Sequence, residues 1–168
     1  MTNLQEGDLL WQPSAATIEQ ANLTRYIGWL AQHKGLHFAA YPELWRWSVQ
    51  NLGPFWQSIW DFCQIKASAR GEIALVDDAM PGARWFPDAR LNYAENIFAQ
   101  SSSMRLSLLY EDELSATQEI SWQELSAKTA ALQQALLAAG VQKGDRVAAY
   151  LPNIPEAIIG CLAVVGLG

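Results

Sequence analysis

The sequence is poor in charged residues. Only 17% of its 168 residues are charged, and 11 basic against 17 acidic side chains give a formal net charge of −6. Because no Lys or Arg cluster interrupts this negative balance, the electrostatic attraction that supports unspecific binding to nucleic acid or anionic lipid is missing. We therefore expect neither nucleic acid nor a membrane as a partner.

Cysteines and long apolar runs are also scarce. Cys63 and Cys161 lie in apolar stretches, without a CxxC motif or a histidine at metal-ligand spacing, and they predict buried free thiols in a reducing cytoplasm. Residues 1–10 carry two acids and no basic residue, unlike a secretory signal. The longest run without a polar side chain, 157–168, is shorter than the roughly 20 residues of a transmembrane helix.

Hydrophobic residues, at 51%, are plentiful enough for a packed core, and the length fits one domain or slightly more. A first helix is predicted to begin at Ser14 or Thr17 and to end at Gly35. Its apolar residues recur at three- and four-residue steps: Ile18, Ala21, Tyr26, Ile27, Leu30 and Ala31.

The stretch 41–63 is rich in aromatic residues, and Pro42 and Pro54 favour two short helices there. Its rings are Tyr41, Trp45, Trp47, Phe55, Trp56, Trp60 and Phe62. Rings at helical spacing usually pack into a core, although such a face can also hold a peptide or a sugar. We interpret residues 1–70 as a helical, Trp-rich N-terminal cap that packs against the part of the chain that follows.

The middle of the chain has a mixed pattern. Residues 72–77 predict a short strand before a turn at 80–82, and a second extended piece ends at Pro87. Residues 91–98 predict a helix, followed by a loop at Ser101–Ser103.

The C-terminal third has the most regular pattern. Residues 106–111 and 117–120 predict a β-hairpin, and the Ser121/Glu124 capping box begins a helix that ends at Gly140. Residues 146–151 are apolar on both faces after the first residue, which is typical of a central strand. A last helix begins at Pro155. This β-α-β-α progression over residues 71–168 predicts an α/β fold.

Residues 157–168 are apolar all round, as in a helix enclosed between layers. A crossover helix is normally followed by a parallel strand, and none follows in this sequence. We therefore expect the chain to be an incomplete N-terminal piece of a larger domain. The alternative is that these residues dock into a partner chain or a second copy.

No residue is assigned a catalytic, cofactor-binding or metal-binding role from the pattern. His33 and His37 flank a helix end, where a surface role is expected. Asp77–Asp78 and Glu111–Glu113 lie at turns, where solvated charge is expected rather than cation ligands. Ser101–Ser103 lacks the glycines of a nucleophile elbow, and the glycines after position 139 form neither GxGxxG nor a Walker loop.

Several spaced motifs resemble the opening of the adenylate-forming superfamily, which includes acyl-CoA ligases. These are Ser121-Trp-Gln-Glu-Leu125, Leu136-Leu-Ala-Ala-Gly-Val141, Gly144-Asp-Arg-Val147 and Tyr150-Leu-Pro-Asn-Ile-Pro-Glu156. Upstream, the segments 80–87 and 89–96 and the Trp-rich stretch 41–61 resemble more narrowly the acetoacetyl-coenzyme A synthetases. The resemblance covers nearly the whole chain from about Leu10.

The resemblance implies a ligase that uses ATP, CoA and Mg²⁺ in its full-length form, with acetoacetate as the acid. The family's phosphate loop, Thr/Glu pair, ribose Asp and C-terminal Lys are not in this sequence, so the chain alone is expected to be inactive and to bind none of these cofactors. Two alternatives stay open. One is an acetyl- or propionyl-CoA synthetase fragment, and the other is a non-catalytic binding module with an aromatic face.

Overall fold

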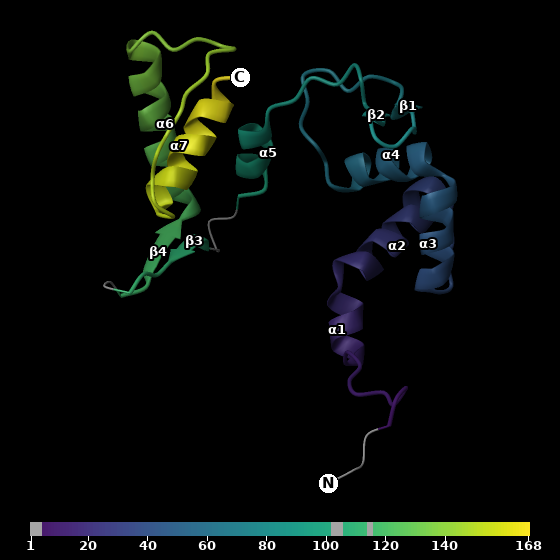
Figure 1. Ribbon diagram of the computed structural model, residues 1–168. Coiled ribbons are helices and arrows are strands. Elements are labelled where there is room, and N and C mark those ends of the chain that lie inside the picture. The colour runs from purple at the N-terminus through teal and green to yellow at the C-terminus, as the bar shows by residue number, and fades with distance from the viewer. Residues whose placement is uncertain (1–4, 102–105, 114–115) are drawn as a thin grey trace. The chain divides into compact units, whose positions relative to one another are not determined.

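The computed structural model describes residues 5–101, 106–113 and 116–168 (Figure 1). The chain forms two compact units. The first unit consists of the residues up to Gln64 together with Ala74–Trp85, and the second consists of Ile65–Ile73 together with Phe86–Gly168. Among the described residues, no helix has both the length and the apolar character to cross a membrane.

Four helices and a small hairpin form the first unit. The helices are α1 (Ala15–Gln20), α2 (Asn22–Lys34), α3 (Tyr41–Gln50) and α4 (Leu52–Phe62). The strands β1 (Leu75–Asp77) and β2 (Arg84–Trp85) are antiparallel. The predicted strand 72–77 is therefore formed only in its second half.

The single helix predicted before Gly35 is wrong, because two helices occupy this stretch. Ser14 is the N-cap of α1, and Gly35 ends α2 with a φ of 65°. Between them Ala21 is extended, with a ψ of 139°. Both the Thr24 hydroxyl and the Ala21 amide donate to the Ile18 carbonyl, which a continuous helix would pair with the Asn22 amide. This competing hydrogen bonding breaks the helix.

The core of the first unit is aromatic. Tyr26, Leu30 and Leu44 are buried at its centre, and partly buried rings from α2, α3 and α4 surround them. Phe62 lies 5.1 Å from Tyr26, measured between ring centroids, and Phe55 meets the same ring edge-on at 6.4 Å. Part of the rings of the Trp-rich stretch therefore packs within the first unit, and the packing of the cap against the part of the chain that follows stays a prediction. Three others stay exposed within the unit: Tyr41, Trp45 and Trp56.

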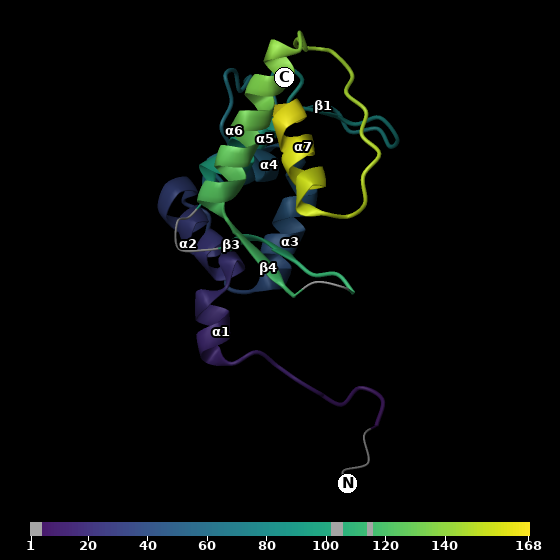
Figure 2. The same cartoon turned by 90° about the vertical axis from the view of Figure 1, so that its left-hand side faces the viewer.

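The second unit contains α5 (Tyr93–Ala99), the hairpin β3 (Leu106–Tyr110) and β4 (Gln118–Ser121), and the helices α6 (Trp122–Ala138) and α7 (Pro155–Gly166). The helix α7 packs against α5 and α6 (Figure 2). The centre of the core contains Ala94, Ile120, Leu125, Ile159 and Leu162.

The end signals predicted around α6 are confirmed. The Ser121 hydroxyl accepts a hydrogen bond from the Glu124 amide at 3.1 Å. At the other end Gly140 has a φ of 92°, and the amides of Gly140 and Val141 donate to the Leu137 and Leu136 carbonyls. This is the Schellman arrangement, so both ends of α6 follow from local sequence.

Two predictions about the second unit are corrected. Residues 146–151 form no strand, because no strand among the described residues pairs with them. Cys161 is exposed rather than buried, since it lies on the face of α7 turned away from the core. Cys63 in the first unit is exposed as well, because it is the C-cap of α4, beyond the last turn that packs inward. Neither cysteine forms a disulfide. The predicted α/β fold class is confirmed by the structural similarity reported below.

Candidate functional site

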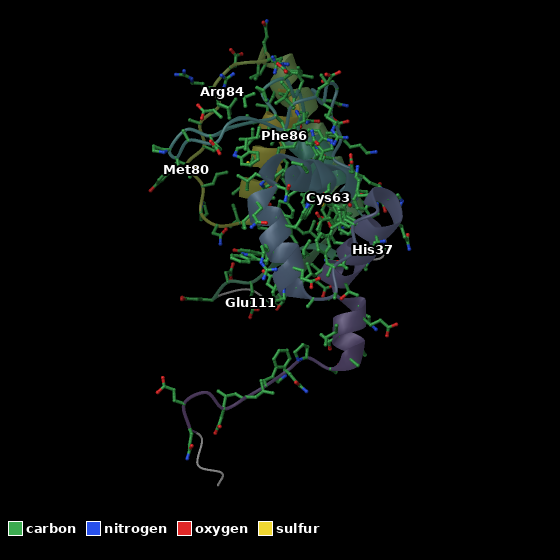
Figure 3. The ribbon with its side chains drawn as sticks, turned by 90° about the vertical axis from the view of Figure 1, so that its right-hand side faces the viewer. His37, Cys63, Met80, Arg84, Phe86 and Glu111 are labelled. Carbon is green, nitrogen blue, oxygen red and sulfur yellow. The ribbon has the colours of Figure 1, made fainter. Side chains whose placement is uncertain are left out.

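The two histidines have surface environments. The His33 ring stacks on Trp29, with centroids 4.9 Å apart, and its Nδ1 lies 3.0 Å from the Trp29 carbonyl oxygen. His37 lies in the loop between α2 and α3 and is exposed (Figure 3). Among the described residues, no hydrogen bond or ion pair to an acid or a nucleophile is seen at either ring, as a general base would need.

The paired acids of the first unit belong to a turn. Asp77 and Asp78 are exposed at the end of β1, and Oδ1 of Asp77 accepts a hydrogen bond from the Ala79 amide at 3.0 Å. This local bond is an Asx turn. Met80, at the tip of the same hairpin, is exposed (Figure 3).

The acids after β3 in the second unit organise a loop. The Tyr110 hydroxyl donates to Asp112 Oδ2 at 2.7 Å, and the Thr117 hydroxyl donates to Glu111 Oε2 at 3.3 Å. The hydrogen bond to Asp112 raises the pKa of Tyr110 above its ordinary value, with smaller contributions from burial and from the charges of Asp112 and Glu156. Within the described ranges, no three His, Cys, Asp or Glu side chains form a metal-binding group.

The described residues of the serine and glycine motifs lie in turns, at a helix end or inside a helix. Of Ser101–Ser103, only Ser101 lies within the described residues, and its amide donates to the Phe98 carbonyl at the end of α5. Gly140 and Gly144 have positive φ values in turns, whereas Gly160 lies inside α7. These roles concern the backbone.

Two residues that connect parts of the second unit, Asn92 and Asn96, lie in the segment 89–96, and the sequence analysis assigned them no role. Asn92 is the N-cap of α5 and accepts from the Glu95 amide, while its Nδ2 donates to the Val165 carbonyl in the last turn of α7 at 2.8 Å. Asn96 binds Lys66 through both ends of its carboxamide, at 2.8 and 2.9 Å. The spacing of Asn92 and Glu95 is a sequence signal for the N-cap of α5. No sequence signal indicates the hydrogen bonds to Val165 and Lys66.

A second carboxamide reaches α7 from α6. Nε2 of Gln133 donates to the Ala163 carbonyl at 3.4 Å. Gly166 lies directly beside this amide, and a Cβ at position 166 would overlap it. Because the last carbonyls of a helix have no partner within the helix, Asn92 and Gln133 supply partners from outside. Asn92 and Gln133 thus hold α5, α6 and α7 in a defined arrangement.

An apolar groove of about 610 Å³ lies along the outer side of the same helices. Leu132 and Leu136 of α6 and Val164 of α7 line it, together with residues of the α6–α7 connection. Its lining is apolar apart from the Glu156 carboxylate and the Cys161 thiol, and it contains no His, Lys or Arg, so the groove lacks the set of groups that acid–base or nucleophilic chemistry needs.

Comparison with known proteins gives these observations a context. Residues 41–97 match the family model of the acetyl-coenzyme A synthetase N-terminus, and residues 98–168 match that of the AMP-binding enzymes. In sequence the chain therefore matches the N-terminal part of acyl-CoA synthetases of the AMP-binding class.

Within that class the similarity is narrower. Acetoacetyl-coenzyme A synthetase of Rhizobium meliloti (strain 1021) is 41% identical over 160 residues, which are 95% of this chain and 24% of that protein. The solved acetoacetyl-CoA synthetase from Streptomyces lividans is 42% identical, with a TM-score of 0.82 over 95% of this chain and 25% of that one. Malonamoyl-CoA synthetase vrtB of Penicillium aethiopicum is 31% identical over 169 residues, which are 96% of this chain and 23% of that protein.

The chain thus matches the N-terminal part of acetoacetyl-CoA synthetase in both sequence and fold, which confirms the resemblance found in the motifs. It spans about a quarter of the length of these relatives. The boundary at residues 70 and 71 and the empty list of site residues stay predictions.

Proposed function

We propose that this chain is the N-terminal part of an ATP-dependent acyl-CoA ligase that activates acetoacetate. The observation that carries the proposal is the 41% identity to an acetoacetyl-CoA synthetase over 95% of the chain. The malonamoyl-CoA synthetase similarity supports the same substrate class. Acetoacetate and malonamate are both short carboxylates with a second carbonyl group on the third carbon.

The proposed reaction has two steps. A carboxylate oxygen of acetoacetate attacks the α-phosphorus of ATP, and pyrophosphate leaves. The thiolate of CoA then attacks the acyl carbon of the adenylate, and AMP leaves. Mg²⁺ would balance the phosphate charge in the full-length enzyme. The described residues contain no metal-binding group, so neither reaction step is assigned to a residue of this chain.

The proposed role of these residues is therefore structural. Asn92, Asn96 and Gln133 fix the arrangement of α5–α7 from which the rest of the domain would continue. The chain alone is proposed to be inactive and to bind neither ATP nor CoA. We also propose a cytoplasmic location, because both cysteines are exposed and neither forms a disulfide, as is usual in a reducing compartment.

An acetyl- or propionyl-CoA synthetase is the second candidate, because residues 41–97 match the acetyl-coenzyme A synthetase N-terminus model. A binding module is a third, favoured by the exposed rings of Tyr41 and Trp45, at 57% and 52%. Small carboxylate substrates, rather than a macromolecule, are the partners proposed for the ligase.

The test compares this chain with the full-length protein that contains it. Acid-dependent exchange of pyrophosphate into ATP is measured with acetoacetate, malonamate, acetate and propionate. We expect exchange with acetoacetate from the full-length protein and none from this chain. A preference for acetate or propionate would overturn acetoacetate as the substrate but leave the acyl-CoA ligase class intact. No exchange with any acid would overturn the ligase proposal.

A further inference from the structure

The segment 5–13, before α1, forms an exposed N-terminal arm. Leu9, Leu10 and Trp11 are 75%, 74% and 75% exposed, and the arm has no regular secondary structure beyond a turn at 6–7. Among the described residues, the hydrogen bonds of the arm stay within the arm itself. In both views the arm runs away from α2, α3 and α4 (Figures 1 and 2). Adjacent large apolar side chains in water, unlike single ones, mark an interaction site.

One face of α3 is also apolar and exposed. Tyr41, Trp45 and Val49 follow each other at four-residue steps, which places them on the same side of the helix, and all three are exposed. A different face of α3 buries Leu44 in the core of the first unit. Tyr41, Trp45 and Val49, the α3 stripe, are therefore the side of this helix that the first unit leaves uncovered.

The arm and the stripe match in spacing and in charge. Alternate side chains of an extended chain lie about 6.6 Å apart, and helical residues four positions apart are separated by about 6 Å along the axis. Leu9 and Trp11 therefore fit between successive side chains of the stripe, with Leu10 pointing away. Glu6 precedes these residues in the arm, and Arg46 lies beside the stripe on α3. Within the described part of the chain, neither Glu6 nor Arg46 has an ion-pair partner.

We infer that two copies of this chain exchange their N-terminal arms, each arm packing on the α3 stripe of the other copy. The partner is a second copy, because the arm runs away from its own α3. A two-fold axis closes the exchange, since each copy gives one arm and receives one. The two contacts together bury on the order of 1,200 Å², at the lower end of the areas of stable interfaces. The exchange involves only the first unit and is independent of the proposed reaction.

Charge sets the conditions of the experiment. Each copy carries a net charge of −6, which opposes association at low ionic strength. At about 0.15 M salt, repulsion between exposed charges more than about 8 Å apart is largely screened. The pair of Glu6 and Arg46 is in contact in the exchanged dimer and is screened less. Association is therefore measured at about this salt concentration.

The test is sedimentation velocity of this chain over a concentration range on the order of 1–100 µM, in which we expect a monomer–dimer equilibrium. Leu9→Ala removes an apolar side chain from the contact and should weaken the dimer about tenfold. The matched control is Leu10→Ala, at the neighbouring leucine of almost equal exposure, which should change the dissociation constant by less than about twofold.

Two further experiments identify the surfaces that meet. Glu6→Lys and Arg46→Glu should each weaken the dimer about threefold, and the double variant, which keeps the net charge of −6, should restore it. A mixture of Trp11→Ala and Trp45→Ala chains contains mixed dimers with one intact contact between an arm and a stripe. This mixture should associate more strongly than either variant alone.

Folding of the variants is checked by thermal unfolding at a concentration where the chain is monomeric. All substituted side chains are exposed, so the parent's unfolding temperature should be kept. Four results would overturn the exchange of arms: a chain that stays monomeric, equal weakening by Leu9→Ala and Leu10→Ala, a double charge variant that does not restore the dimer, or a mixture that associates no more strongly than its two components.

Discussion

The two units hold their helices together in different ways. In the first unit, rings from α2, α3 and α4 surround Tyr26 and Leu30, and the hydroxyls of Tyr26 and Ser58 form a buried hydrogen bond of 2.5 Å. In the second unit, small residues bring the helices close, and the carboxamides of Asn92 and Gln133 bind the end of α7. Apolar rings supply non-directional stability, whereas carboxamides specify which turn of one helix faces another.

Removing one buried leucine in each unit is expected to have the largest effect. Leu30 and Leu125 are 0% and 2% exposed, so Leu30→Ala and Leu125→Ala should each lower the free energy of unfolding of their own unit by about 2–5 kcal/mol. Seven of the eight tryptophans belong to the first unit. Tryptophan fluorescence during urea unfolding therefore follows the first unit, and hydrogen exchange of α6 follows the second.

The control for these variants is Leu10→Ala, at a side chain that is 74% exposed, which should change stability by less than about 0.5 kcal/mol. If Leu125→Ala moved the fluorescence midpoint as far as Leu30→Ala does, the two cores would unfold as one and the comparison between them would lose its basis.

Helix caps provide a sharper contrast. Asn92 caps α5 with its side chain and also binds α7, so Asn92→Ala should cost about 1–2 kcal/mol in the second unit. Asn51 is also an N-cap, of α4, but its side chain makes no cap hydrogen bond, and its exposed Nδ2 donates instead to the Trp47 carbonyl at 3.1 Å. Asn51→Ala should therefore cost about 0.5 kcal/mol, less than Asn92→Ala. Thermal unfolding of both variants checks this, and equal losses would contradict the special role of Asn92.

Two glycines of α7 allow a matched test of close packing. A Cβ at Gly166 would displace the Gln133 amide, whereas a Cβ at Gly160 meets nothing within 4 Å. Gly160→Ala should stabilise the second unit by up to about 1 kcal/mol through helix propensity. Gly166→Ala should not stabilise the second unit, because the added methyl group breaks the hydrogen bond from Gln133 to Ala163 and this loss offsets the gain in helix propensity.

The measurement is urea unfolding followed by far-UV circular dichroism. Adding Gln133→Ala to Gly166→Ala should recover part of the difference, because the clash is then absent. Equal stabilisation by both single alanine variants would show that Gln133 does not position α7.

Alkaline titration gives the smallest expected effect. Burial raises the pKa of Tyr26. The hydrogen bond with Ser58 partly offsets this rise, and the charge of Cys63 adds to it. Above about pH 10 the unfolded chain then binds fewer protons than the folded chain, so the stabilisation present at lower pH is lost as the pH rises through the folded pKa. Because the pKa of Tyr110 is raised as well, absorbance of tyrosinate should show both residues titrating late, and Tyr26→Phe should remove one of the two. A titration unchanged by that substitution would exclude Tyr26 as the perturbed group.

Much of the fold follows from local sequence patterns. The helices at 41–50 and 52–62, the hairpin at 106–121 and both ends of α6 agree with their caps, prolines and apolar periodicity. The break at Ala21 escaped this reasoning because the hydroxyl that competes for the Ile18 carbonyl comes from Thr24, six residues later. The buried thiols were also predicted wrongly, since an apolar neighbourhood in sequence does not say which face of a helix turns inward.

The sequence by itself determined where most helices begin and end and to which class of synthetase the chain is similar, because caps, turns and motifs act over a few neighbouring residues. Only the tertiary structure decided that Asn92 and Gln133 reach α7 and that residues 146–151 lie open above an apolar groove. These features join residues up to 73 positions apart. Contacts of that range depend on how whole elements pack, and no local pattern encodes them.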